Sequence, residues 1–140
     1  MRVPIVIAAT LMVSACLFYL TPLRFLNPVD PPMYDVDPAI AYANMLADPE
    51  HFLFIDVRQS SAYKVEHAVG AINIPLQNLY NDRFALPKTG KTIVLICGDG
   101  RAAGVAYGYL EHYGFLNLQR IEGGLKAWVN AGLPTLKGGG

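Results

Sequence analysis

The sequence predicts an α/β fold with a central parallel β-sheet flanked by helices on both faces. Two observations support this prediction. Short apolar runs rich in β-branched residues alternate along the chain with segments of helical spacing, which is the pattern of βαβ units. The clearest of these runs, Thr92–Ile96, is β-branched and apolar throughout, as expected of a strand that is buried on both sides.

The boundaries of the elements follow from local signals. Asp37 followed by Pro38 is a good helix start, because an acidic side chain can cap free N–H groups and proline fits the first helical position. The helix predicted at residues 39–47 ends before Pro49. The other predicted elements, in chain order, are strands at residues 51–55, 71–74 and 92–96, a helix at about residues 101–112 closed by Gly114, a strand at residues 116–121, and a helix at residues 125–131 closed by Gly132.

Composition and charge exclude several kinds of protein. The chain has 140 residues, which is the size of one ordinary domain, and its prolines and glycines are scattered rather than repeated. Eleven Lys and Arg residues balance eleven Asp and Glu residues, so no global field favours a nucleic acid. No pair of cysteines or histidines has the spacing of zinc ligands. We therefore expect no nucleic-acid partner, no metal and no cofactor.

The N-terminal residues 1–26 are expected to form a transmembrane or signal helix. No charged residue occurs from Val3 to Leu23, a stretch long enough to cross the hydrocarbon core of a bilayer. The favoured interpretation is an uncleaved signal anchor that places the domain on the periplasmic or extracytoplasmic side of the membrane. A cleaved secretory signal is one alternative. Another is a lipoprotein signal, because the residues that end in Cys16 resemble a bacterial lipobox.

Residues 27–35 are rich in proline and read as a spacer, and the domain is expected at residues 36–137. Its only cysteine, Cys97, ends the most buried strand and precedes Gly98-Asp99-Gly100 and a helix start. Ligands of parallel sheets bind beyond the carboxyl ends of the strands. Glycines allow consecutive N–H groups to form an anion-binding nest, and the helix start adds partial positive charge; Arg101 adds a full one. The pattern therefore predicts a stabilised thiolate that acts as a nucleophile.

Four segments in this order resemble the rhodanese family, and they cover Val36 to about Leu136. They are the Phe-Ile-Asp-Val-Arg signature at residues 54–58, the segment from Tyr63 to Pro75, the strand that delivers the cysteine at residues 93–97, and the C-terminal signature in residues 114–134. The chain is accordingly identified as resembling single-domain, thiosulfate sulfurtransferase-like members of that family. The resemblance implies a rhodanese-like fold and a rhodanese-type sulfurtransferase.

The resemblance assigns roles to individual residues. Cys97 would be the nucleophile that takes a sulfane sulfur from a donor such as thiosulfate or a persulfide, and the persulfide would pass it to cyanide, a thiol or a protein thiol. The backbone amides of the following loop would form the cradle. We expect Asp56 and Arg58 to brace the end of the sheet and His67 to be a structural hydrogen bonder. The predicted substrate-binding residues are Gly98, Asp99, Gly100, Arg101 and Ala102.

Two other kinds of protein share parts of this pattern. Thiol phosphatases need an arginine at position 103 to grip the phosphate, and that residue is Ala103. A non-catalytic rhodanese-like module for binding or regulation is the other alternative, although such modules usually lose the cysteine. Within the loop, Asp99 carries a charge that opposes both a thiolate and an anionic donor. We therefore expect this loop to impair sulfur transfer from thiosulfate more than transfer from other sulfur donors.

Overall fold

A five-stranded parallel sheet forms the centre of the domain in the computed structural model, which describes residues 33–138. In spatial order its strands are β1 (Asp35–Val36), β6 (Leu118–Ile121), β5 (Thr92–Ile96), β2 (Phe52–Asp56) and β4 (Ile72–Asn73). Two further strands, β3 (His67–Ala68) and β7 (Thr135–Leu136), pair antiparallel in a separate two-stranded sheet. The expected membrane or signal segment and residues 27–32 of the expected spacer lie outside the described residues.

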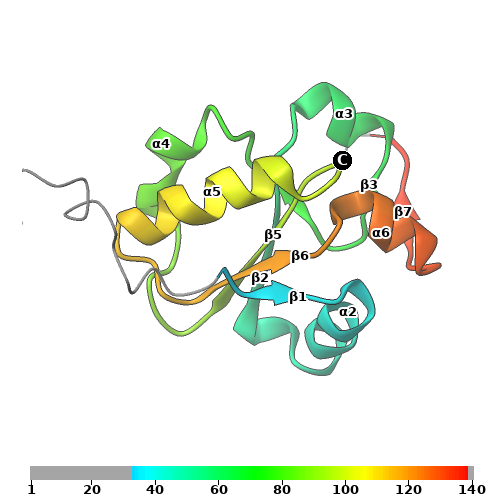
Figure 1. Ribbon diagram of the computed structural model, residues 1–140, viewed down its shortest axis with the longest axis horizontal. Coiled ribbons are helices and arrows are strands. Elements are labelled where there is room, and N and C mark those ends of the chain that lie inside the picture. Colours follow the sequence, from blue (N-terminus) through cyan, green and yellow to red (C-terminus); the bar gives the residue numbers. More distant parts are fainter. Residues whose placement is uncertain (1–32, 139–140) are drawn as a thin grey trace, which may run out of the picture. The chain divides into compact units, whose positions relative to one another are not determined.

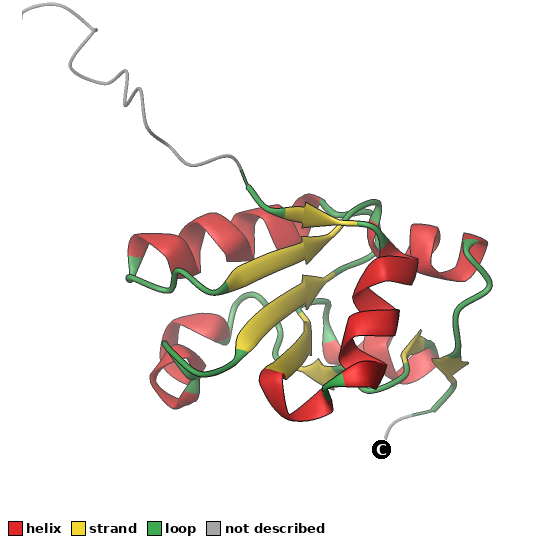
Figure 2. Ribbon diagram, turned by 90° about the horizontal axis from the view of Figure 1, so that it is seen from below, coloured by secondary structure: helices red, strands yellow, loops and turns green. Residues whose placement is uncertain are grey.

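Helices cover both faces of the sheet (Figure 1, Figure 2). One face carries α4 (Leu79–Asp82) and α5 (Arg101–His112), and the other carries α2 (Pro38–Ala47) and α6 (Gly124–Asn130). The remaining helical elements are α3 (Ser60–Val65) and the 3-10 turns η2 (Pro49–His51) and η3 (Arg83–Ala85). This arrangement confirms the predicted α/β class with a parallel sheet between two helical layers.

The two faces of the sheet form two separate cores because side chains alternate along each strand. On β5, Ile93 and Leu95 join the core under α4 and α5, whereas Val94 and Ile96 join the core under α2 and α6. All four side chains are fully buried, at 0% exposure. The central position of β5 in the sheet therefore explains its uninterrupted apolar sequence, and it fixes the point where Cys97 emerges.

Several predicted elements have the expected bounds. Strand β5 and helix α5 agree with the prediction at both ends, and α2 begins with Pro38 after the Asp37 cap. The Asp37 carboxylate accepts the N–H groups of Ala39 and Ile40 at 2.8 and 3.2 Å. Strands β4 and β6 are shorter than predicted.

Helices α3 and α4 and strands β1, β3 and β7 were not predicted, because elements of two to six residues are too short to show a periodic pattern. Strand β1 begins at Asp35, the last residue of the expected spacer. Among residues 33–138, no helix combines the length and apolar character that a bilayer span requires.

The buried position of β5 makes a stability prediction. Replacing Leu95 with Ala leaves a cavity in the core under α5, and we expect the free energy of unfolding to fall by about 2–5 kcal/mol. Leu116→Ala is the matched control, because Leu116 is 86% exposed and its loss should change stability by about 0.5 kcal/mol or less. Urea unfolding followed by circular dichroism measures both. Equal losses for the two variants would contradict the assignment of the core.

Candidate active site

Cys97 lies at the carboxyl end of β5, directly before the loop that leads into α5 (Figure 1). The residue is 1% exposed, and its Sγ accepts the backbone N–H of Gly100 at 3.1 Å. We call residues 97–100 the Cys97 loop. Its end coincides with the N-terminus of α5, where the first N–H groups of a helix have no partner within the helix. The thiol therefore sits against hydrogen-bond donors and the positive end of a helix dipole.

The N-terminus of α6 holds the carbonyl groups of the Cys97 loop. The backbone N–H of Leu125 donates to the carbonyl of Cys97 at 2.7 Å, and the N–H of Lys126 donates to the carbonyl of Gly98 at 3.1 Å. In a planar trans peptide, the carbonyl of one residue and the N–H of the next point in opposite directions. The N–H groups of Gly98 and Asp99 therefore point away from α6. Neither N–H donates to another residue within residues 33–138.

Two glycines allow this close approach. Gly100 has a φ of +94° and Gly124 a φ of +63°, both in the region that side chains rarely adopt. A Cβ atom on Gly124 would lie 2.5 Å from the carbonyl oxygen of Cys97 and 2.8 Å from the nitrogen of Asp99. Gly124, the first residue of α6, is therefore a packing requirement of the Cys97 loop.

Asp99 and Arg101 form an ion pair at the rim of the loop. The Arg101 Nε donates to Asp99 at 2.7 Å, Nη2 lies 2.5 Å from the same carboxylate oxygen, and the Arg101 N–H donates to the other oxygen at 3.1 Å. Hydrogen bonds from Arg101 lower the pKa of Asp99, so the pair persists until the pH falls below the ordinary range of a carboxyl group. The Arg101 side chain is 91% exposed. The sequence predicts that the full charge of Arg101 acts on the thiolate. In the structure, the Asp99 carboxylate neutralises much of that charge.

Arg120 of β6 also reaches the loop, and sequence reasoning missed it. Its guanidinium binds Asp35 of β1 through two hydrogen bonds of 2.6 Å and lies 3.4 Å from the carbonyl oxygen of Gly100. The hydrogen bonds to Asp35 raise the pKa of Arg120, and the charge of a Cys97 thiolate adds to that effect. A Cβ on Gly104 would lie 2.7 Å from Arg120 Nη1, so a larger residue there would have to displace the guanidinium from its place beside the Gly100 carbonyl. The available signal was an arginine near the carboxyl end of the strand predicted at residues 116–121.

Asp56 and Arg58, expected to brace the sheet end, form a buried ion pair beyond β2. Asp56 is fully buried, and Arg58 binds its carboxylate through the backbone N–H at 2.9 Å and through Nη2 at 2.6 Å. Arg58 Nη2 also donates to the carbonyl of Glu66 at 2.7 Å. Asn73 of β4, which sequence reasoning did not single out, donates to the carbonyls of Asp56 and Arg58 at 3.0 and 2.9 Å. These bonds tie β2, α3 and β4 together.

His67 is buried next to Glu66, whose carbonyl Arg58 contacts. It is 4% exposed, its Nδ1 donates to the carbonyl of Tyr63 at 2.9 Å, and the two rings stack with centroids 3.7 Å apart. The Tyr63 hydroxyl donates to the carbonyl of Ala71 at 2.6 Å. Within residues 33–138, no three His, Cys, Asp or Glu side chains come together in a way that could hold a metal.

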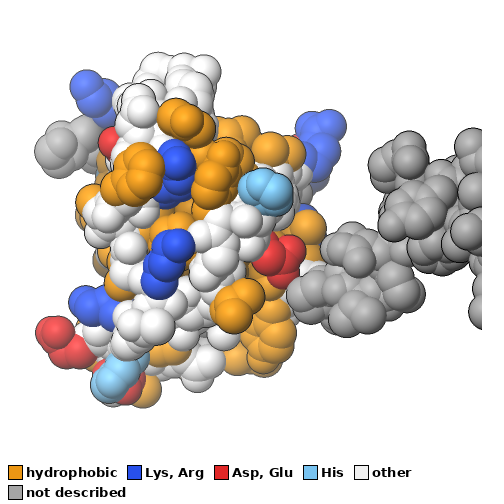
Figure 3. Space-filling view, turned by 90° about the vertical axis from the view of Figure 1, so that its left-hand side faces the viewer, with side chains coloured by type: hydrophobic (Ala, Val, Ile, Leu, Met, Phe, Trp, Pro, Cys, Tyr) orange, Lys and Arg blue, Asp and Glu red, His pale blue; other side chains and the backbone are white. Residues whose placement is uncertain are grey.

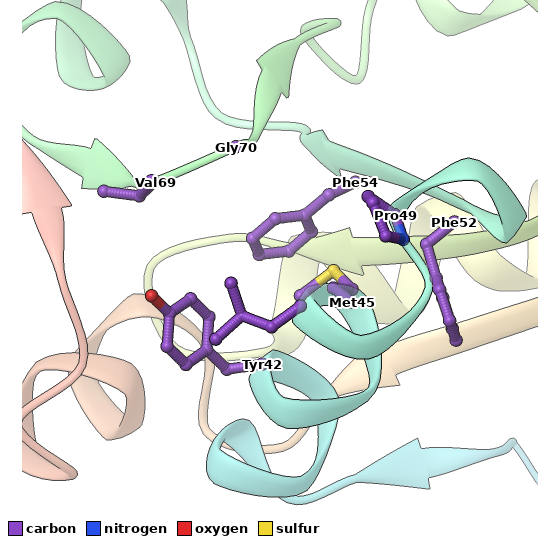
Figure 4. Close-up of a pocket in the computed structure, with 8 residues that line it drawn as sticks. Tyr42, Met45, Pro49, Phe52, Phe54, Val69 and Gly70 are labelled. Carbon is purple, nitrogen blue, oxygen red and sulfur yellow. The ribbon is translucent and has the colours of Figure 1, made fainter.

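An apolar pocket of about 190 Å³ lies between α2 and β2 (Figure 4). Figure 4 shows Tyr42 and Met45 of α2 opposite Phe54 of β2. None of its lining residues belongs to the Cys97 loop. This pocket is therefore separate from the site that the sequence predicts at Cys97.

Comparison with known proteins identifies the family. Residues 38–131, about two thirds of the chain, match the model of the rhodanese-like domain. The chain belongs to the rhodanese-like domain family. The rhodanese-like domain of this chain contains both the Cys97 loop and the α6 N-terminus that holds it.

Relatives of this rhodanese-like domain include proteins with and without a described activity. An uncharacterised protein of Synechocystis is 37% identical over 66% of this chain, which spans about half (51%) of that relative. Thiosulfate sulfurtransferase PspE of Escherichia coli is 34% identical over 71% of this chain and 91% of its own length. The crystal structure of a rhodanese-related protein from Thermoplasma volcanium has a TM-score of 0.65 and 26% identity, with 74% of this chain and 97% of that chain covered.

The contact between α6 and the Cys97 loop predicts that alanine substitutions of two glycines lower stability by different amounts. Gly124 and Gly132 both have positive φ, but a Cβ would meet the loop at Gly124 and nothing within 4 Å at Gly132. We expect Gly124→Ala to lower the free energy of unfolding by about 1–3 kcal/mol more than Gly132→Ala, because overpacking adds to the shared backbone strain. Denaturant unfolding of both variants provides the measurement. Equal losses would mean that Gly124 does not pack on the loop as described.

Proposed function

We propose that this rhodanese-like domain is a sulfurtransferase that carries a sulfane sulfur as a persulfide on Cys97. The observation that carries the proposal is the position of the Cys97 sulfur at the end of β5, 3.1 Å from the N–H of Gly100 and at the start of α5. The E. coli relative named as a thiosulfate sulfurtransferase, which matches over most of its length, supports the same activity.

The reaction has two balanced steps. The Cys97 thiolate attacks the outer sulfur of thiosulfate, the S–S bond of the donor breaks, and sulfite leaves with the electron pair. The product is a Cys97 persulfide anion. An acceptor such as cyanide or a thiolate then attacks the terminal sulfur, and the Cys97 thiolate leaves. No proton must be transferred in either step when the thiolate is already formed, so the site needs no general base.

The Cys97 loop is suited to the persulfide because the extra sulfur carries the negative charge. The amides of Gly98 and Asp99 are turned away from α6, and the free amides at the start of α5 add further donors. Preformed donors stabilise an anion without reorganisation during the reaction. A phosphatase is a poorer proposal, because position 103 is a fully buried alanine of α5.

The proposal predicts that a single sulfur atom can be loaded onto Cys97. The chain has two cysteines, so the test uses the Cys16→Ser chain, in which any adduct must be on Cys97. After incubation with thiosulfate or polysulfide, intact-mass spectrometry should show a gain of one sulfur atom, which cyanide removes as thiocyanate. The same chain with Cys97→Ser should show no gain. Absence of an adduct from a folded chain whose thiol can be alkylated would leave a binding module as the better account.

Substitutions of the two members of the Asp99–Arg101 ion pair should have opposite effects on the rate of reaction with an anionic donor. Asp99→Asn removes the charge that opposes thiosulfate, whereas Arg101→Gln leaves that charge unpaired. At low ionic strength we expect persulfide formation from thiosulfate to be about two- to tenfold faster in the first variant and slower by a similar factor in the second. Alkylation of Cys97 by the neutral reagent iodoacetamide is the control and should change less. Identical rates with thiosulfate in both variants would show that the pair does not influence the donor.

The apolar stretch at residues 3–23 supports the further proposal that the chain is attached to a membrane, with the domain on the extracytoplasmic side. Fractionation of cells that express the full chain tests it: recovery in the membrane fraction with an intact N-terminus is expected. Recovery only in the soluble fraction would favour the cleaved, secreted form, and a mature chain that begins with lipidated Cys16 would favour the lipoprotein.

A further inference from the structure

A buried arginine lies at the end of the domain opposite to the Cys97 loop. Arg83 in η3 is 9% exposed, and its guanidinium carbon lies 4.4, 4.2 and 4.3 Å from the ring centroids of Tyr80, Phe84 and Tyr113. Aromatic faces attract a cation, but they do not satisfy its N–H groups. The three rings therefore surround the guanidinium, but its N–H groups still need hydrogen-bond acceptors.

Within residues 33–138, no carboxylate forms an ion pair with Arg83. A guanidinium has five N–H donors, and the described residues provide one acceptor, the carbonyl of Tyr80, which Nη1 contacts. The other arginine in a comparable position, Arg58, is fully paired with Asp56. A buried cation without a counter-ion is costly, so most of the Arg83 donors are left for an anion from outside.

A second cation and a pocket lie beside Arg83. Lys88 Nζ donates to the carbonyl of Tyr113 at 2.8 Å and sits 5.2 Å from the ring centroid of Phe115, which leaves two of its three N–H groups. A pocket of about 250 Å³ is lined by both cations and by apolar side chains. Figure 3 shows this face, where basic side chains are set among apolar ones. The lining residues are Arg83, Phe84, Leu86, Lys88, Tyr113 and Phe115.

We propose that this pocket binds a small organic anion, with a phosphate or carboxylate group on Arg83 and Lys88 and an apolar body against Phe84 and Tyr113. The planar guanidinium can grip either group with two parallel hydrogen bonds. Phe84 is 79% exposed, so most of its ring is accessible to a ligand in the pocket.

The pocket is independent of the sulfur chemistry. Tyr113 follows the last residue of α5, whereas Cys97 lies before its first residue, and the 12 residues of α5 span about 18 Å. Substitutions of Arg83 or Lys88 should therefore leave persulfide formation on Cys97 unchanged. The anion-binding proposal can therefore fail while the sulfurtransferase proposal holds, and the reverse is also true.

Calorimetric titration of the full chain with phenyl phosphate tests the pocket. We expect saturable binding of one molecule, weakened about tenfold or more by Arg83→Gln and several-fold by Lys88→Gln. Lys64→Gln, on an exposed position of α3, removes the same charge elsewhere and should bind as the parent chain does. Because Lys88 is exposed, its variant keeps the test valid even when Arg83→Gln lowers stability.

Two other titrants distinguish the source of the anionic group. Tighter binding of phenyl phosphate than of inorganic phosphate and of water-soluble dihexanoyl phosphatidic acid indicates a small aromatic or apolar anion. Tighter binding of the lipid indicates a headgroup, and both results support the site. No saturable binding of any of the three overturns the proposal. Equal affinity in the parent, Arg83→Gln and Lys88→Gln chains also overturns it, because the anion would then bind elsewhere, such as at the Cys97 loop.

Discussion

Two backbone hydrogen bonds from the N-terminus of α6 determine the geometry of the Cys97 loop. The N–H groups of Leu125 and Lys126 hold the carbonyls of Cys97 and Gly98, and planar peptides then turn the following amides away from α6. The first N–H groups of α6 have no partners within their own helix, so the loop satisfies them in return. A helix that packs on one face of the sheet thus orients the donors around a thiol at its edge.

The sheet beneath this loop is tied at its carboxyl edge by two ion pairs, of which only Asp56–Arg58 contains a fully buried group. Arg58 satisfies the fully buried carboxylate of Asp56, and Arg120 joins Asp35 of β1 to the loop. Removing Arg58 would leave the buried charge of Asp56 unpaired and should be strongly destabilising, although the intact pair adds little net stability. These pairs therefore fix where the strands end, and with them the position of Cys97, rather than the stability of the whole domain.

The sequence alone predicts the parts of this domain that depend on local signals. Strand β5, helix α5 and the position of Cys97 between them follow from an apolar run, two glycines and helical spacing. The role of Arg120 could not be predicted, because its partner Asp35 is 85 residues away and becomes a neighbour only when β1 pairs with β6. The pairing of Arg101 with Asp99 was missed for another reason: counting charges in a loop does not show which of them neutralise each other.

We propose that the amides of the Cys97 loop stabilise the sulfur that Cys97 carries. The most direct measurement compares backbone ¹⁵N–¹H NMR spectra of the chain before and after one sulfur is added to Cys97. We expect large shifts for the amides of residues 98–100 and of Ala102 and Ala103, and small shifts for those of Leu125 and Lys126, which remain bonded to the loop carbonyls. Unchanged loop amides in a chain that has gained the sulfur would contradict it.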